Sequence, residues 1–436
     1  MRGFTKRWAA PIAVLAVGAV ALSACSAGGG SDATSSTAGA SGGASQPAEI
    51  NVFVIPSPSA SALEKMGPEF TAKTGIKVNF TETEYGTAHQ KALLSIQAKQ
   101  GAYDVVQYDN TFLAAFANAG ALAPLNDYTK NSTAYDISDF SPALQQYGDY
   151  KGQSYGLVLS TEPFLLWYRK SLLDKAGQSV PTTWDQYEAV SKATNAGGVA
   201  GQVMGYGPNT DWWWMQLVWS YGGQLYSKDF KPLVNTPEAV AATQFYKDML
   251  QYAPKGALGL NGDDVTSQFT STDIAQMIQY SGYASLIYDP KTSSFSDDIL
   301  AANVPAGKVN AVELAGWNIG IPADAPNKDA GWQFLEFALG KANAQKMLEL
   351  GAAAIGRKSV TSDPAMLAKY PYLSLLTLDK PDLLVYPYPH LVVWPEFDKA
   401  CADALADIVA GKVPVQDGLN ALNDKLATIL AKEPPA

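Results

Sequence analysis

Apolar positions after residue 49 alternate between short runs and wider, helix-like spacings. The run INVFVI over residues 50–55 predicts a buried strand, and apolar residues one turn apart over 59–73 predict a helix that stops at Gly75. The strand IKVNF, a helix over 88–100 and the strand YDVVQY follow in turn. Because strands that alternate with helices usually pair in parallel, this pattern predicts an α/β layer with a parallel sheet.

A second α/β region is predicted after the segment GLVLS, which ends at Ser160. It contains the aromatic stretch DWWWMQLVWSYGGQ over residues 211–224, and helical spacing follows over 236–253. Helix predominates late in the chain, from FDKACADALADIVAGK to a final amphipathic segment. We therefore expect two lobes that exchange strands.

The first 25 residues have the layout of a secretory signal, with three basic residues before an apolar run over 12–22 that is too short to span a membrane comfortably. The sequence Leu-Ser-Ala-Cys that ends at Cys25 resembles the lipobox of bacterial lipoproteins, which implies cleavage before this cysteine and its acylation. A plain cleaved signal is the alternative. Residues 26–48 are nearly all Gly, Ser, Ala and Thr, and predict a flexible tether.

The composition is that of an ordinary globular protein, with 436 residues, 47% of them hydrophobic and 17% charged. Without the three basic residues of the signal, 28 Lys and Arg face 41 Asp and Glu, a net charge of −13 that argues against a nucleic-acid partner. After the signal the chain contains only two arginines, Arg169 and Arg357. Because arginine is the usual residue for binding carboxylate or phosphate groups, this favours a neutral ligand over an anionic one. The one later cysteine, Cys401, is expected in buried helix packing, so no internal disulfide is predicted.

Catalytic patterns are sparse in this sequence. The segment GQSYG around Ser154 matches the nucleophile elbow of hydrolases, but an elbow needs a helix directly after the serine, and the following residues have extended character. The two histidines, His89 and His390, are too few for a zinc site without several carboxylates, and no Walker-type glycine loop is present. We therefore expect no metal and no cofactor.

The carboxylates leave two functions open. Asp109, Glu162 and Asp211 would serve as the acid and base of a glycosidase if they lined one cleft. The same groups, when ionised, accept hydroxyl hydrogen bonds and so orient a bound sugar. Asp109 follows the strand YDVVQY, at the strand end where α/β proteins bind ligands.

The four tryptophans of residues 211–224 fit a ligand better than a membrane surface, because no basic residue flanks them. Flat aromatic side chains cover the apolar faces of sugars and leave the ring edges to polar groups. Helical geometry separates the three consecutive indoles, so a single core cannot take them all. We assign Trp214 and Trp219 to the core.

Five segments, in order, resemble the type 1 extracellular solute-binding proteins, the sugar-binding class of ABC importers to which maltose-binding protein belongs. They are YDVVQYDNTFLAAFANAGALAPLNDY, KGQSYGLVLSTEPFLLWYRKSLLDKAGQSVPTTWDQYEA, NTPEAVAATQFYKDM, AGWNIGIPADAPNKDAGWQFLEFAL and AIGRKSVTSDP. The second, over residues 151–189, is the strongest match, and the similarity extends from about Ile50 to Leu430.

The resemblance implies a bilobal, periplasmic-binding-protein-like type II fold, in which two α/β lobes joined by a multi-strand hinge close around the ligand. It places one lobe at residues 49–156 plus 314–359 and the other at 157–313 plus 360–436. It implies a substrate-binding lipoprotein that is not an enzyme. Such a protein captures a neutral oligosaccharide, here expected to be a di- or trisaccharide, and delivers it to an ABC permease. We expect a monomer on the extracellular face of the cell membrane, held there by its lipid anchor.

Two other functions remain open from the sequence. One is a secreted glycosidase or esterase that uses the carboxylates or Ser154. The other is a binding protein for a non-sugar solute such as a polyamine, which the acidic balance permits.

The resemblance also implies which residues contact ligand. Relatives place stacking aromatics at the positions of Trp212, Trp317 and Trp394. The segment AGW that contains Trp317 departs from their Gly-Gly-Trp pattern. Relatives also have a turn that faces the cleft at the position of Tyr283. Arg357 is expected either to donate to hydroxyls or to form a structural salt bridge. Trp167, Trp184 and Trp332 fall on packing positions. The expected ligand residues are Tyr108, Asp109, Glu162, Asp211, Trp212, Trp213, Tyr283, Gly316, Trp317, Arg357 and Trp394.

Overall fold

The computed structural model describes residues 48–434 except residues 209, 379, 381, 388 and 389. The signal, Cys25 and residues 26–47 of the tether lie outside the described residues. No helix among the residues described is long and apolar enough to cross a membrane.

One five-stranded sheet contains the strands predicted near the N-terminus. Its order is β2-β1-β3-β11-β6, in which the first three strands are parallel and β11 runs antiparallel to both of its neighbours. Its strands are β1 (Glu49–Val54), β2 (Lys77–Glu82), β3 (Val105–Asp109), β6 (Leu157–Val158) and β11 (Trp317–Gly320). The predicted parallel α/β layer is therefore present.

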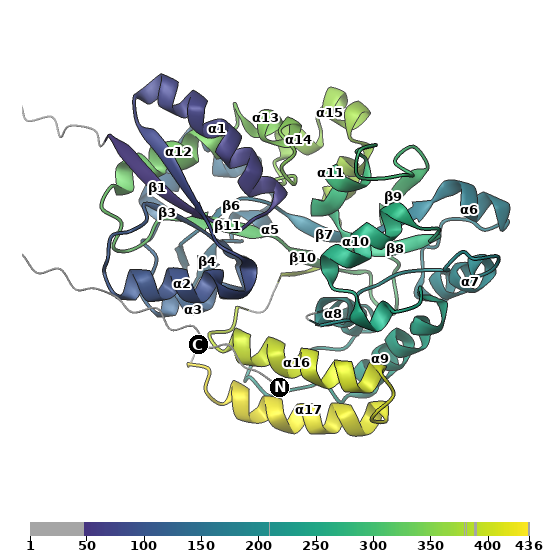
Figure 1. Ribbon diagram of the computed structural model, residues 1–436. Helices are drawn as coiled ribbons and strands as arrows, with labels where there is room; N and C mark the ends of the chain where they lie inside the picture. The colour runs from purple at the N-terminus through teal and green to yellow at the C-terminus, as the bar shows by residue number, and fades with distance from the viewer. Residues whose placement is uncertain (1–47, 209, 379, 381, 388–389, 435–436) are drawn as a thin grey trace, which may run out of the picture. The chain divides into compact units, whose positions relative to one another are not determined.

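Helices cover both faces of this first sheet, which buries the apolar residues of β1 on either side (Figure 1). α1 and α12 pack on one face, and α2 and α3 on the other. Ser57 caps the start of α1, since its Oγ accepts a hydrogen bond from the N–H of Ala60, and the predicted Gly75, with a φ of 79°, caps the end. The bounds are α1 (Pro58–Thr74), α2 (Tyr85–Gln97), α3 (Leu113–Asn118), α12 (Lys328–Leu339) and α13 (Ala344–Glu349).

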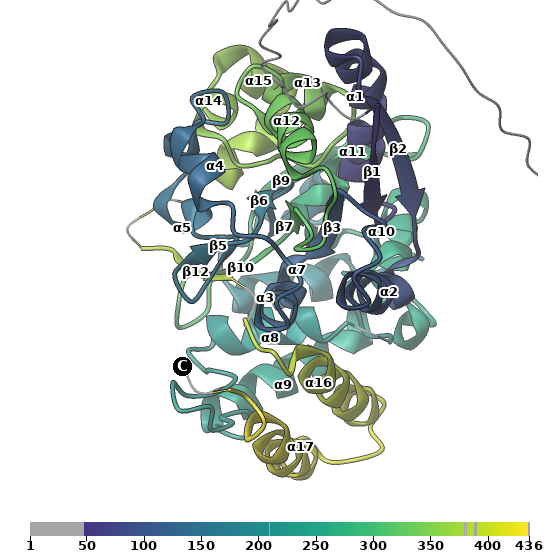
Figure 2. The ribbon, with the colours of Figure 1, turned by 90° about the vertical axis from the view of Figure 1, so that its left-hand side faces the viewer.

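A second sheet has the order β12-β10-β7-β8, and β9 also pairs with β7. Its strands are β7 (Glu162–Arg169), β8 (Gln276–Tyr280), β9 (Ile299–Asn303), β10 (Ala311–Ala315) and β12 (Leu384–Pro387). The helices of this part are α6 (Lys170–Lys175), α7 (Trp184–Thr194), α8 (Asp211–Ser220), α9 (Pro237–Met249), α10 (Gly262–Ser271), α11 (Ala284–Ile287), α16 (Trp394–Val409) and α17 (Val415–Leu430). α16 and α17 lie side by side, as Figures 1 and 2 both show.

Several short elements connect the larger ones. They are α4 (Asn126–Asn131), α5 (Pro142–Gln145), the hairpin of β4 (Asp149–Tyr150) and β5 (Gln153–Ser154), α14 (Lys358–Thr361) and α15 (Pro364–Lys369). Ser154 lies in this hairpin and the strand β6 follows it, so the strand-turn-helix geometry of a nucleophile elbow is not formed there.

The chain crosses between the two sheets where β6 leads to β7 and where β10 leads to β11. At the second crossing Gly316 has a φ of 148°, and a Cβ atom there would lie 2.2 Å from the carbonyl oxygen of Ser160. The two sheets with their helices form the expected two α/β lobes. Strand membership puts 157–158 in the first sheet and 311–315 in the second, so we propose lobe limits a few residues away from the expected 156 and 313.

Candidate ligand-binding site

Asp109 lies at the carboxyl end of β3 with its side chain held by three hydrogen bonds. Its Oδ1 accepts from the N–H and Oγ1 of Thr111 at 3.0 and 2.9 Å, and its Oδ2 accepts from the Tyr85 hydroxyl at 3.1 Å. The N–H of Asp109 donates to Nε2 of His89 at 3.0 Å, and burial lowers the pKa of His89 to about 3. A neutral histidine therefore fixes the backbone that carries this carboxylate.

Tyr85 is a member of this group that sequence reasoning missed. Its side chain is 43% exposed, and its ring stands edge-on to Trp317 at 5.9 Å between ring centroids. Surrounding protein raises the pKa of Tyr85 well above its usual value, and the acids Asp109, Asp398 and Asp211 raise it further. Acids from both lobes therefore lie around the hydroxyl of Tyr85.

Glu162 opens β7 and stands close to the same acids. Its Oε1 accepts from Oγ of Ser160 at 2.5 Å. Burial, with a smaller contribution from the charge of Asp109, raises the pKa of Glu162 to about 7. Gly282 gives this carboxyl room, because a Cβ atom there would lie 2.1 Å from Oε2 of Glu162.

Tyr283 is half-buried beside this group. Its hydroxyl donates to Oδ1 of Asp263 at 2.6 Å, and burial raises its pKa well above the usual value, with further contributions from Asp263 and Glu162. The ring therefore belongs to the same desolvated neighbourhood as the expected carboxylates.

Asp211 and Asp398 form a pair of acids at the first turn of α8 and near the start of α16. Asp211 is only 1% exposed, and Asp398 is half-buried. Burial raises the pKa of Asp211 well above its usual value, and the charge of the neighbouring Asp398 raises it further. Burial and the charge of Asp109 raise the pKa of Asp398 to about 7. Two neighbouring buried carboxyls do not both ionise readily, because like charges at close range repel each other.

Asp398 was not expected from the sequence, although a signal was available. It stands four residues after Trp394 on one helix, and residues at that spacing share a face.

The expected aromatic residues divide into accessible and covered rings. Trp212 and Trp317 are half-buried, whereas Trp394 and Trp213 are 1% and 2% exposed. Trp394 packs against Trp212 with ring centroids 5.6 Å apart, so it supports the accessible indole. Trp213 donates from Nε1 to the carbonyl oxygen of Ile278 at 2.7 Å within the core. Its burial argues against the expected ligand contact.

Tyr108 and Arg357 lie apart from this group. Tyr108 is fully buried and packs on Phe116. Arg357 is also fully buried; it donates to the carbonyl oxygens of Tyr135 and Leu339 at 2.6 and 2.7 Å and pairs with Asp139. Neither side chain offers a surface to a ligand, so we remove both from the expected set and assign Arg357 to the structural alternative.

The remaining tryptophans pack as the pattern predicts. Trp214 donates from Nε1 to Oγ1 of Thr243 at 2.7 Å, and Trp219 stacks on Tyr386 with ring centroids 5.0 Å apart. Cys401 is completely buried on α16, in keeping with its expected helix packing.

His390 joins the segment before α16 to the end of β3. Its Nε2 lies 3.0 Å from Oδ1 of the buried Asn110. The Asn110 amide already donates to Tyr147 and Asn318, so its oxygen accepts and the proton of the histidine sits on Nε2. Burial lowers the pKa of His390 to about 4, which keeps this link between the lobes neutral.

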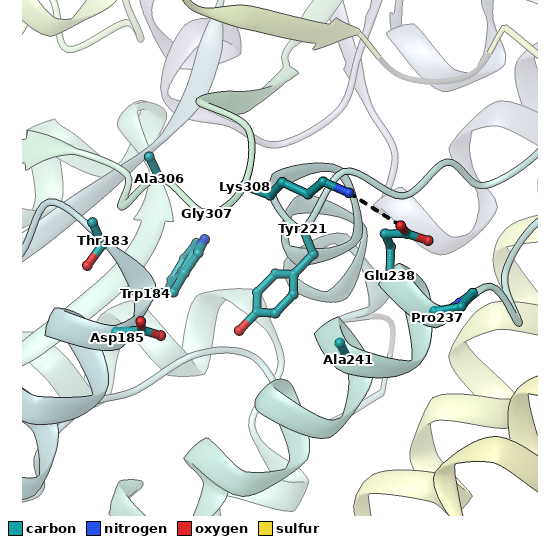
Figure 3. Close-up of a pocket in the computed structure, with 10 residues that line it drawn as sticks. All are labelled: Thr183, Trp184, Asp185, Tyr221, Pro237, Glu238, Ala241, Ala306, Gly307 and Lys308. Atoms are coloured by element: carbon teal, nitrogen blue, oxygen red, sulfur yellow. Dashed lines mark hydrogen bonds and ion pairs between the residues drawn. The ribbon is translucent and has the colours of Figure 1, made fainter.

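Cavities lie elsewhere in the described part of the chain. One of about 490 Å³ is lined by Trp184, Tyr221, Glu238 and Lys308 in the second lobe (Figure 3). Two more, of about 240 and 700 Å³, are lined by residues of the first lobe. Within the described residues, no group of three or more His, Cys, Asp and Glu side chains is arranged to hold a metal ion.

Comparison with known proteins identifies the family. The family model for the bacterial extracellular solute-binding protein matches residues 56–345. A mannitol-binding protein of Pseudomonas aeruginosa is 25% identical over 349 residues, which are 74% of this chain and 78% of that protein. A ribitol complex of an ABC transporter solute-binding protein from Agrobacterium radiobacter K84 has a TM-score of 0.79 at 25% identity and covers 88% of this chain and 99% of its own.

Maltose-bound MalE3 of T. maritima shares the fold, with a TM-score of 0.77 at 23% identity, over 87% of this chain and 99% of its own. These similarities confirm the bilobal fold and the resemblance stated from the sequence. Proteins of this family bind solutes and do not transform them. The chain is a member of the bacterial extracellular solute-binding protein family, a binding protein and not an enzyme.

Proposed function

We propose that this protein captures a neutral di- or trisaccharide between its two lobes and delivers it to the permease of an ABC transporter. The observation that carries the proposal is the meeting of half-buried indoles and carboxyls from both lobes. Trp317 and Asp109 come from the first lobe, and Trp212 and Asp398 from the second. Indole faces cover the apolar sides of a sugar ring, and the carboxyl groups accept from its hydroxyls.

Closure follows from the same arrangement. A ligand shifts an equilibrium between open and closed states only if it binds one of them more tightly. A sugar held by Asp109 and Asp398 together contacts both lobes, and such contacts exist in the closed state alone. His390 and Asn110 add a neutral link to that state.

A sugar alcohol is the second candidate. Trp213 and Trp394 are covered by protein, which leaves fewer open indole faces than a chain of two or three sugar rings would use. The relatives from Pseudomonas aeruginosa and Agrobacterium radiobacter bind mannitol and ribitol. A flexible polyol needs hydroxyl acceptors more than stacking surfaces, and the carboxyls supply them.

We further propose that the mature protein begins at Cys25, that acyl chains on this cysteine hold it at the extracellular face of the membrane, and that it works as a monomer. Cell fractionation tests the anchor. Cys25→Ser should release the protein into the medium, whereas retention of this variant in the membrane fraction would refute acylation as the anchor.

Thermal unfolding of the purified protein with a panel of mono-, di- and trisaccharides, sugar alcohols and polyamines tests the function. A ligand present at about 100 times its Kd adds about 2.7 kcal/mol to the unfolding free energy. Trp212→Ala and Trp317→Ala should abolish most of the shift that a sugar or polyol causes. Tyr221→Ala, which removes a half-buried ring beside the cavity of Figure 3, is the matched control and should retain it.

If polyamines alone raise the midpoint, the proposal of a hydroxylated ligand is wrong. Chromatography of the ligand after incubation should recover it intact, as binding without turnover requires.

A further inference from the structure

The ligand site is rich in acids and has no basic partner for them. In the described part of the chain, Asp109, Glu162, Asp211 and Asp398 form no ion pair with any Lys or Arg. Every charged group that shifts the pKa values of Glu162, Asp211 and Asp398 is another acid. The protein itself therefore supplies no cation to balance this part of the site.

Asp211 is the most unusual of these acids. It is 1% exposed, and neither of its side-chain oxygens accepts from a hydroxyl or N–H group of the described residues. The group that faces it is the carboxyl of Asp398, whose own Oδ1 is buried without a donor. Burial of a carboxylate that has neither a hydrogen-bond donor nor a cation destabilises the folded state. The free-energy cost is larger than that of burying an unpaired neutral group.

The groups around the pair cannot relieve this cost. Asp109 acts on Asp398 from β3, Glu313 acts on Asp211 from β10, and both are acids. Cys401, on α16 itself, is a buried thiol whose pKa burial and the two acids raise; the cation that acts on this thiol, Lys425, forms its ion pair with Asp403 and not with Asp211 or Asp398. The hydroxyl of Tyr85 already donates to Asp109.

A proton or a cationic ligand group would each balance the pair. We propose, building on the proposed function of this site, that Asp398 together with Asp211 binds an ammonium group of the ligand, so that an amino sugar or amino polyol binds more tightly than its neutral analogue. An ammonium group brings three donors and one positive charge, and its bonds to a carboxylate are about twice as strong as those between neutral groups. Asp398 is the half-buried member of the pair and makes the direct contact.

Binding of the ammonium group displaces the proton that the two carboxyls share, and this proton passes to solvent. The pKa of Asp398, raised to about 7, sets the range in which the exchange is visible. Between about pH 5 and about pH 7 the preference for the amine should grow, because the pair gives up its proton more readily as the pH rises.

Calorimetry with matched ligand pairs is the test. The probes are glucosamine with glucose, diglucosamine with cellobiose, and glucamine with sorbitol. In at least one pair the amine should bind about tenfold more tightly than the neutral compound, which corresponds to one charge-assisted contact. Asp398→Asn, which keeps the size of the side chain and removes its charge, should reduce the ratio of the two affinities to near one. Asp407→Asn, on the same helix with an exposed carboxylate paired to Lys412, is the control and should leave the ratio unchanged.

The outcomes separate the two proposals. Neutral compounds that bind as tightly as their amines, or a preference that survives in Asp398→Asn, would overturn the ammonium subsite and leave the sugar or polyol proposal intact. Binding of putrescine or spermidine, lost in Asp398→Asn, without binding of any hydroxylated compound would support the subsite and overturn the proposed function. Absence of binding by every probe would overturn both.

Discussion

Two buried charged groups of this protein have opposite surroundings. Arg357 has every part of its guanidinium occupied by the carbonyl oxygens of Tyr135 and Leu339 and by the carboxylate of Asp139. Asp211 is almost as deeply buried, yet another acid, Asp398, faces it. A charged group that finds its partners within the chain stabilises the fold, whereas one that lacks them is arranged for a partner from outside. Hydrogen bonds completed within the chain assign Arg357 to the fold, and we propose that Asp211 and Asp398 are arranged for a group of the ligand.

Removal of the occupied group should have the largest effect. Arg357→Met leaves the buried Asp139 without its cation and takes the guanidinium donor from the carbonyl oxygens of Tyr135 and Leu339, so we expect a loss of about 3–5 kcal/mol in unfolding free energy. Urea unfolding followed by tryptophan fluorescence measures it. Lys358→Met changes an exposed neighbour and should stay within about 0.5 kcal/mol of the parent protein. If the two variants unfold at the same urea concentration, the structural role of Arg357 is wrong.

Two tryptophans of α8, the buried Trp214 and the half-buried Trp212, allow the same comparison for aromatic side chains. Trp214→Phe removes the hydrogen bond to Thr243 and part of a fully buried ring, which should cost roughly 2 kcal/mol of stability and leave ligand affinity unchanged. Trp212→Ala should do the reverse, with a small loss of stability and about a tenfold loss of affinity. Calorimetry and urea unfolding on both variants measure the two effects. A loss of affinity in Trp214→Phe that equals the loss in Trp212→Ala would remove the distinction between them.

The sequence predicted the fold well because apolar periodicity reports which faces are buried. The strand INVFVI, the helix stop at Gly75 and the core positions of Trp214 and Trp219 all followed from it. Resemblance to the family supplied the two-lobed arrangement, which periodicity alone does not specify because strand order depends on contacts between distant segments.

The site was predicted in part. Asp109 was placed from its position at a strand end, and the structure puts it beside Trp317. Trp213 and Trp394 were expected to touch ligand, but their burial depends on tertiary packing that helical spacing cannot show. Tyr85 and Asp398 were missed because each becomes important only through acids that lie far away in the sequence.

Gly316, where the chain crosses from β10 to β11, tests how the backbone positions the candidate site. Gly316→Ala forces a side chain into a left-handed conformation and places its Cβ against the carbonyl oxygen of Ser160, so we expect a loss of roughly 2 kcal/mol together with weaker ligand binding through displacement of Trp317. Gly351→Ala is a matched control, because this glycine also has a positive φ, of 98°, but open space where a Cβ would lie. It should show the smaller cost of backbone strain alone. Equal losses in both variants would mean that the close approach at Ser160 contributes nothing.

The smallest expected effect is the pH dependence of stability, and it concerns the acid pair itself. The pKa of Asp398 is about 7 in the folded protein and near 3.8 when unfolded, so between these values the folded state binds a proton that the unfolded state does not. Stability contributed by this group is therefore fully present below about pH 4 and is lost as the pH rises toward about 7.

Urea unfolding at a series of pH values, for the parent protein and for Asp398→Asn, isolates this contribution. The two pKa values set an upper limit of about 4 kcal/mol, and solvent screening of the half-buried Asp398 reduces it. The parent should lose roughly 1 kcal/mol more than Asp398→Asn across the range, because asparagine cannot take up the proton. Asp407→Asn should follow the parent, since its exposed carboxylate is paired with Lys412 and lies away from the other acids. Parallel curves for the parent and Asp398→Asn would show that the carboxyls share no proton. The proposal that Asp211 and Asp398, unlike Arg357, lack a balancing charge within the fold would then be wrong.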